Sequence, residues 1–114
     1  MTAPSERTWL TVPDLVQLLD IPQGRVRRLI QDKALLAIRV DGVLKVPSVF
    51  VRDGEPLSEL RGTVILLNDA GYTDEEAMHW LLAANDMLGG IAPIDALLAG
   101  RKAEVRRVAQ SLGF

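Results

Sequence analysis

The strongest constraint on the fold of this chain is a pair of β-prone runs separated by a two-residue turn. The runs are residues 37–40 and 43–46, and the turn between them is Asp41-Gly42. Asp and Gly both accept the positive φ angles that a type I′ turn requires at its two central positions. The pattern therefore predicts a tight antiparallel hairpin, to which Arg39 and Lys45 add positive charge.

The residues before this hairpin have the pattern of two short helices joined by a turn. Thr11 and Asp14 have the spacing of a reciprocal cap, which predicts the start of the first helix. The turn follows at residues 20–24, where Asp20 is a residue type that tolerates a left-handed corner. In the second helix the apolar residues recur at helical spacing and are expected to face inward, namely Val26, Leu29 and Ile30.

Helix, turn, helix and basic hairpin, in this order, is the layout of a winged helix-turn-helix DNA-binding domain. The segment 11–47, in which the string VPDLVQLLDIPQGRVRRLIQDKAL precedes the hairpin, resembles the MerR and excisionase type of that fold. The resemblance covers about a third of the chain and implies that the second helix and the hairpin, or wing, contact double-stranded DNA.

Length and composition exclude several other kinds of protein. The chain has 114 residues, 48% of them hydrophobic, and contains no cysteine. Disulfides, thiolate metal sites and cysteine nucleophiles are therefore excluded. No apolar run approaches the roughly 18 residues of a membrane span, and we expect a cytoplasmic protein without a membrane partner or a cofactor.

The formal net charge of −2 conceals an uneven distribution of charge along the chain. Residues 23–52 carry a net charge of +5, residues 53–100 carry −8, and residues 101–114 carry +3. Because binding to DNA depends on where positive charge lies, the total does not argue against it. The basic block coincides with the second helix and the hairpin.

The fold expected from these patterns is mainly α (α+β), with a winged helix-turn-helix domain followed by a C-terminal helical module. Residues 1–8 are expected to form a flexible tail, 9–52 the DNA-binding domain and 57–114 the helical module packed on it. Residues 48–51 read as an extended segment and 52–56 as a linker. Helices are predicted over 57–70, from Thr73 onward through a second capping box with Glu76, from Pro93 to the residue before Gly100, and over 101–112.

The C-terminal half has a second recognisable pattern, formed by Trp80, Leu81, Asn85, Leu88, Gly89, Gly90, Pro93, Ile94, Asp95, Leu97, Glu104 and Val105. These residues resemble the toxin-binding domain of Xre/MbcA/ParS-type antitoxins. This resemblance implies a toxin protein as partner, and the candidate contacts are Leu88, Gly89, Gly90, Ile91 and Ile94. The alternative is that these apolar side chains complete the core, which we favour because so short a chain has little apolar surface to spare.

The order of the two halves resembles a family of small actinobacterial winged-helix DNA-binding proteins described as Ser/Thr protein kinase substrates. That resemblance implies a kinase as a further partner, with Thr2, Ser5 and Thr8 as the candidate phosphorylation sites.

The candidate DNA-binding residues lie on the second helix and the hairpin: Gln23, Arg25, Arg27, Arg28, Gln31, Lys33, Arg39 and Lys45. Gln23, Arg25 and Arg28 lie nearest the part of the helix that usually reaches base edges, where arginine pairs with guanine and glutamine with adenine. Arg27, Lys33, Arg39 and Lys45 are expected to contact phosphate, which adds affinity without reading sequence.

No arrangement of residues indicates an enzyme or a metal site. His79 is the sole histidine, and no nucleophile is paired with it. We therefore expect sequence-specific binding of double-stranded DNA and transcriptional regulation, with a homodimer as the simplest assembly because one recognition helix reads only part of a site. The alternatives are an antitoxin and a purely structural domain whose basic block is a solvated helix face.

Overall fold

The computed structural model describes residues 7–112, and three short strands lie at the centre of their N-terminal half. These strands are β1 (Trp9–Thr11), β2 (Ile38–Val40) and β3 (Val43–Pro47), and they form an antiparallel sheet in the order β1-β3-β2. Trp9 pairs with Pro47 and Ile38 with Lys45, so the first ordered strand closes onto the hairpin. The mixed α and β character expected from the sequence is confirmed.

The hairpin has the predicted turn. Val40 pairs with Val43, which leaves two residues to connect the strands. Asp41 has φ of 53° and Gly42 has φ of 79°, both in the left-handed region that a type I′ turn requires.

The helix-turn-helix consists of α1 (Val12–Leu19) and α2 (Gln23–Gln31). The Asp14 backbone N–H donates to the Thr11 hydroxyl, and the Thr11 N–H donates to the Asp14 carboxylate, so the predicted capping box is present. Asp20 ends α1 with φ of 56°, the left-handed corner expected of this residue type.

The connection after β3 differs from the prediction. Residues 48–51 were expected to be extended, but Ser48–Phe50 forms a 3₁₀ turn that places Phe50 in the core. The expected linker is a second small hairpin of β4 (Val51–Arg52) and β5 (Glu55–Pro56). The Leu57 backbone N–H donates to the Phe50 carbonyl at 2.8 Å, and this bond closes the segment into a defined corner.

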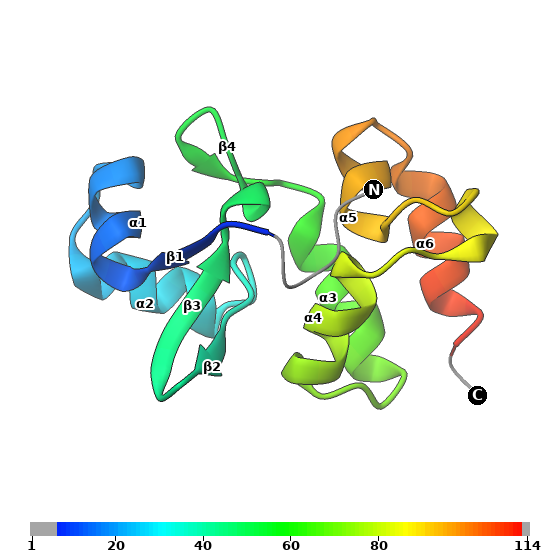
Figure 1. Ribbon diagram of the computed structural model, residues 1–114, viewed down its shortest axis with the longest axis horizontal. Helices are drawn as coiled ribbons and strands as arrows, with labels where there is room; N and C mark the ends of the chain where they lie inside the picture. The colour runs from blue at the N-terminus through cyan, green and yellow to red at the C-terminus, as the bar shows by residue number, and fades with distance from the viewer. Residues whose placement is uncertain (1–6, 113–114) are drawn as a thin grey trace.

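Four helices and a short 3₁₀ turn make up the C-terminal module (Figure 1). The helices are α3 (Leu60–Asp69), α4 (Asp74–Leu82), α5 (Pro93–Leu98) and α6 (Lys102–Gln110), and the 3₁₀ turn is η3 (Asp86–Leu88). The predicted capping box of Thr73 and Glu76 is present at the start of α4. The helix expected from residue 57 begins three residues later, because Leu57 ends the preceding hairpin.

A single hydrophobic cluster joins both halves of the chain. It includes Leu15 and Leu35 from the N-terminal half and Leu60, Leu81 and Leu97 from the C-terminal module. The described residues extend over 37 × 28 × 27 Å. The helix-turn-helix and its sheet lie at one end and α5 and α6 at the other, with α3 and α4 between them (Figure 1).

The N-terminal boundary expected from the sequence is wrong for residues 7 and 8. The Arg7 side chain is only 4% exposed and pairs with the Asp95 carboxylate at 2.9 Å, and the Ser48 N–H donates to the Thr8 carbonyl. The ion pair of the buried Arg7 with a distant helix and the backbone bond of Thr8 hold these two residues in the fold, so they are not part of a flexible tail. Residues 1–6 lie outside the described part.

Ile94 gives a direct test of the core of the C-terminal module. Its side chain is fully buried, so the change Ile94→Asp would place a carboxylate among apolar neighbours at a cost of at least about 3 kcal/mol. That is a large share of the roughly 5–15 kcal/mol that stabilises a domain. We expect thermal melting to show an unfolded or strongly destabilised protein. Met87, which is 67% exposed, supplies the control, because Met87→Asp should leave the melting temperature nearly unchanged.

The capping box of α1 predicts a pH dependence. Hydrogen bonds from the Thr11 N–H and then the Thr11 hydroxyl lower the pKa of Asp14 below its usual 3.8. A carboxyl with a lowered folded-state pKa stabilises the fold above the unfolded value and loses that effect as the pH falls through the folded value. Asp14→Asn should therefore melt earlier than the unchanged protein at neutral pH. The gap should narrow below pH 3.8, and a gap that widened in acid would contradict this account.

Candidate nucleic-acid interface

One face of α2 is polar, cationic and open to solvent. Val26 is fully buried and Leu29 and Ile30 are half-buried, so these three side chains fix the inward face of the helix. The remaining long side chains of α2 are exposed, and all five are predicted DNA contacts: Gln23, Arg25, Arg27, Arg28 and Gln31.

Within this face the side chains are not equivalent. Arg28 and Gln31, three residues apart, lie on the side of the helix opposite its buried residues. Gln23 and Arg25 lie nearer the edges of the exposed face, at the N-terminal end of the helix. No ion pair within the described residues engages any of the three α2 arginines, so their charge is available to a ligand.

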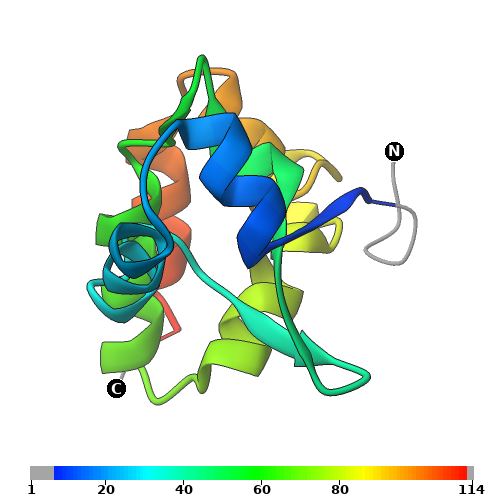
Figure 2. The same ribbon diagram turned by 90° about the vertical axis from the view of Figure 1, so that its left-hand side faces the viewer.

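The hairpin of β2 and β3 presents its own cations at the same end of the molecule. Arg39 is exposed, and its Nη1 donates to the Gly42 carbonyl at 3.2 Å, so the guanidinium lies against the turn. Lys45 is half-buried on the central strand, between Thr11 and Ile38. Figure 2 shows this end of the molecule, with α1, α2 and the hairpin facing the viewer.

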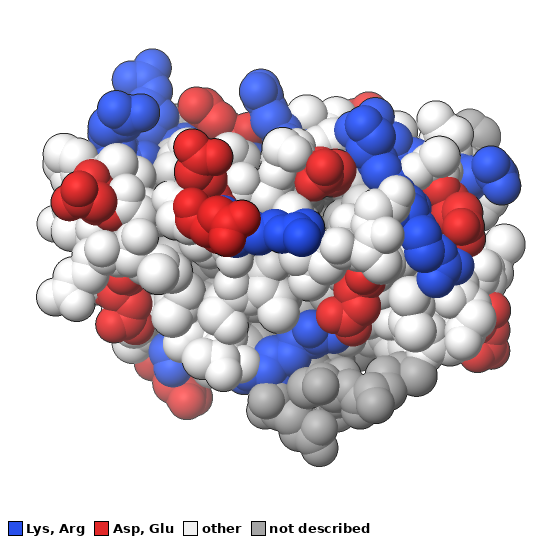
Figure 3. Space-filling view, turned by 90° about the horizontal axis from the view of Figure 1, so that it is seen from above, with Lys and Arg blue, Asp and Glu red and all other residues white. Residues whose placement is uncertain are grey.

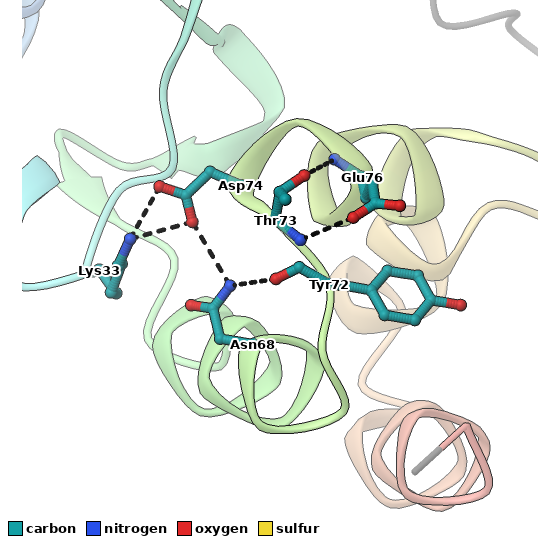
Figure 4. A network of polar contacts seen from close by, with 6 residues as sticks. All are labelled: Lys33, Asn68, Tyr72, Thr73, Asp74 and Glu76. Carbon is teal, nitrogen blue, oxygen red and sulfur yellow. Dashed lines mark hydrogen bonds and ion pairs between the residues drawn. The ribbon is translucent and has the colours of Figure 1, made fainter.

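Lys33 does not join this exposed group. Its Nζ lies 2.9 and 2.8 Å from the two carboxylate oxygens of Asp74, the first residue of α4 (Figure 4). Asn68 also donates to Asp74, at 3.4 Å, and to the Tyr72 carbonyl at 3.0 Å. The phosphate contact predicted for Lys33 stays a prediction. In the structure the ammonium group of Lys33 joins the end of α2 to the C-terminal module.

The face of the molecule seen from above carries both signs of charge (Figure 3). Seen from above, red and blue side chains alternate along the molecule, and a blue group projects at the upper left, the end that holds α1 and α2 (Figure 3). This face therefore has no uniform positive field, and attraction of a polyanion to it must be local.

The apolar patch that would serve an antitoxin is not on the surface. Leu88 is 1% exposed and Ile94 is fully buried, so the prediction that these side chains contact a partner is wrong, and the favoured alternative of burial is confirmed for both. They are buried because the Asn85 N–H donates to the Ile91 carbonyl and closes the loop onto the core. Ile91 and Gly90 are half-buried and Gly89 is exposed at the corner of that loop.

A shallow groove on α4 is separate from the predicted DNA-binding residues. It has a volume of about 430 Å³ and is lined by Tyr72, Glu75, Glu76, His79 and Trp80. No group of three or more His, Cys, Asp or Glu side chains in residues 7–112 is arranged to hold a metal ion. Within the same range no helix is both long and apolar enough to cross a bilayer.

Sequence reasoning missed the residues that join the two halves. Arg7 reaches Asp95 and the Leu82 carbonyl, and Arg52 Nη1 donates to the Leu98 carbonyl at 3.3 Å. No local pattern marks these cations, because their partners lie 46 or more residues away. Of the candidate phosphorylation sites, Thr8 is exposed, and Thr2 and Ser5 lie outside the described residues.

Comparison with known proteins covers both halves of the chain. Residues 2–51 match the family model for the winged helix-turn-helix domain of the DNA-binding protein Rv2175c, and residues 57–113 match the model for the Rv2175c C-terminal domain of unknown function. The DNA-binding protein Rv2175c of Mycobacterium tuberculosis is 31% identical over 123 residues, which cover 97% of this chain and 84% of the relative.

The solved structures include a close likeness in fold. The NMR structure of Rv2175c matches with a TM-score of 0.84 at 29% sequence identity, over 96% of this chain and 83% of that one. The winged helix-turn-helix expected from the sequence is confirmed, and so is the expected family of small actinobacterial winged-helix proteins. The chain is a member of the Rv2175c family and contains both of that family's domains.

Proposed function

We propose that this protein binds double-stranded DNA in a sequence-specific way and regulates transcription. The observation that carries the proposal is the exposed, unpaired cationic face of α2 beside a basic hairpin. An α-helix fits the major groove of B-DNA, and a neighbouring hairpin can reach the adjoining backbone. The name of the M. tuberculosis relative, a DNA-binding protein, supports the same function.

The roles we assign follow the positions of the side chains on α2. Arg28 faces away from the core, and Gln23 and Arg25 lie at the N-terminal end of the helix, so these three are assigned to base edges. Arg27, Arg39 and Lys45 are assigned to phosphate, and Gln31 to either. We do not assign Lys33 to phosphate, because Asp74 already neutralises its charge.

A second copy of the chain and a Ser/Thr protein kinase are the two further partners that we predict. A homodimer would let two copies of α2 read successive half-sites, about 34 Å apart along the duplex. A Ser/Thr kinase would find Thr8 accessible, since this residue is exposed beside the buried Arg7. No observation on the C-terminal module favours a toxin as its partner.

DNA binding should weaken steeply with salt. About four to six phosphate contacts imply a slope of roughly −4 to −5 in a plot of log affinity against log salt concentration.

The change Arg28→Ala should cost about 1–3 kcal/mol of binding free energy on a preferred sequence selected from a random library, by loss of base-edge hydrogen bonds. Fluorescence anisotropy with labelled duplexes measures both quantities.

Arg107→Ala supplies the matched control. Arg107 is an exposed arginine on α6, outside the helix-turn-helix, and its removal should leave the affinity for the preferred sequence nearly unchanged. Absence of binding at low salt would remove the proposed function. If Arg28→Ala instead lowered the affinity equally for every DNA sequence, Arg28 would contact phosphate and not base edges.

The hairpin turn predicts a separate effect. Gly42 has φ of 79°, which a β-branched residue strongly disfavours, so Gly42→Val should distort the turn and displace Arg39. We expect weaker DNA binding with the helical circular dichroism retained. Gly42→Asn is the control, because Asn tolerates the left-handed region. Equal affinities for all three proteins would show that the hairpin does not touch DNA.

A further inference from the structure

The end of α2 is held by a contact between the two domains of the family. Lys33 lies two residues beyond the last residue of α2, and its ammonium group is shared between both oxygens of Asp74, at 2.9 and 2.8 Å. Lys33 falls in the segment matched by the winged-helix model, and Asp74 in the segment matched by the C-terminal model. We call this contact the Lys33–Asp74 clasp.

The backbone of Lys33 is in a conformation that lysine rarely adopts. Its φ is 66°, the left-handed region in which helices commonly end on glycine. The Leu35 N–H donates to the Leu29 carbonyl across this corner, so the position is a genuine helix stop. Glycine would serve the backbone better, but glycine has no side chain to reach Asp74. The long cationic side chain at this corner therefore points to a role for the clasp itself.

The carboxylate of Asp74 is held in place on its own side. Asp74 is the first residue of α4, where the helix dipole favours a negative charge. Asn68 from α3 donates to the same carboxylate, and the neighbouring Thr73 and Glu76 fix the start of the helix (Figure 4). Lys33 thus binds a carboxylate that belongs to α4 and is also held by a hydrogen bond from α3.

Two other cations of the N-terminal half dock on the same module. Arg7, just before β1, binds Asp95 and the Leu82 carbonyl, and Arg52 in β4 binds the Leu98 carbonyl. These contacts lie at the first strand and at the second hairpin, away from α2. The Lys33–Asp74 clasp is the polar contact among them that acts directly on the end of the DNA-binding helix.

We propose that the C-terminal module sets the orientation of α2 for DNA through the Lys33–Asp74 clasp. This inference rests on the proposed DNA binding and gives the module a function in it. Lys33 and Asp74 act as positioning residues: they do not touch DNA, but they hold the helix whose arginines do. A helix end that moves by about 1 Å would misplace side chains that must meet base edges within hydrogen-bond distance.

The change Asp74→Asn separates this proposal from a phosphate role for Lys33. If Asp74 merely competed with DNA for Lys33, the change would free the lysine, remove a negative charge and raise affinity. If the clasp positions α2, the same change should lower affinity, by about three- to fivefold as expected for a partly exposed ion pair. The two readings therefore predict opposite signs.

Glu75→Gln is the matched control for the loss of charge. Glu75 is the next residue of α4 and is exposed, and its side chain makes no hydrogen bond or ion pair within the described residues. Its neutralisation removes the same charge from the same helical turn, so it should leave DNA affinity unchanged or raise it slightly. An affinity for Asp74→Asn that equals or exceeds that of Glu75→Gln would overturn the proposal.

The role of the lysine in the clasp is tested by Lys33→Asn, because asparagine tolerates the positive φ at this position. We expect an affinity loss similar to that of Asp74→Asn, an unchanged salt slope, and no further loss in the double variant because both changes break one interaction. A slope that became shallower by about one unit would show that Lys33 contacts phosphate, and additive losses would show that the two side chains act separately. Either result would overturn the proposal.

A measurement without DNA separates failure of the clasp from failure of the proposed function. Hydrogen exchange at the backbone amides of Asp32, Lys33 and Leu35 should be faster in Asp74→Asn than in Glu75→Gln, because the end of α2 is then less restrained. Equal exchange in the two variants would overturn the clasp even if DNA binds. A protein that showed the difference and bound no DNA would instead refute the proposed function, and with it the positioning role.

Discussion

The continuous hydrophobic core is the constraint on which the rest of the structure depends. The two segments recognised as separate family domains contribute to one cluster of buried side chains, with Leu35 and Phe50 from one segment and Leu60, Leu81 and Ile94 from the other. A segment of 50 to 60 residues buries too little apolar surface to be more than marginally stable alone. The boundary between the segments is therefore a boundary of sequence families and not of folding units.

Apolar contact between the two halves does not by itself fix how they are oriented relative to each other. The polar contacts between them fix that orientation. Cations from the N-terminal half end on acceptors of the C-terminal module at three separated places, through Arg7, Lys33 and Arg52. Three such contacts restrain one half of the fold against the other. This arrangement gives a physical meaning to the opposite net charges of the two segments, since an acidic module is a favourable surface for basic side chains to dock on.

The parts of the fold that could be predicted are those whose cause is local in sequence. Two capping boxes, the left-handed Asp20 and the Asp41-Gly42 turn each depend on residues within four positions of one another, and all are present. The buried Arg7 was missed because its partner, Asp95, comes from a distant helix and leaves no periodic signal. The second hairpin at 51–56 was missed although its cause is local, since Asp53 and Gly54 form a left-handed turn between β4 and β5 like that of Asp41-Gly42. The exposed arginines of α2 were predicted for the same reason as the turns, since an amphipathic helix assigns its own outer face.

Lys33 shows why a charge at the right place in the sequence is not yet a contact with DNA. By sequence alone it belongs with the arginines of α2, because it lies five residues after Arg28 and its charge has the same sign. In three dimensions the left-handed corner at its φ of 66° carries its side chain away from that face and onto α4. A cation neutralised by a carboxylate adds little attraction for phosphate, whereas the same ion pair across two segments restrains both. The basic block of the sequence therefore contains cations that bind the C-terminal module, Lys33 and Arg52, as well as the exposed arginines of α2. Only the tertiary contacts tell the two kinds apart.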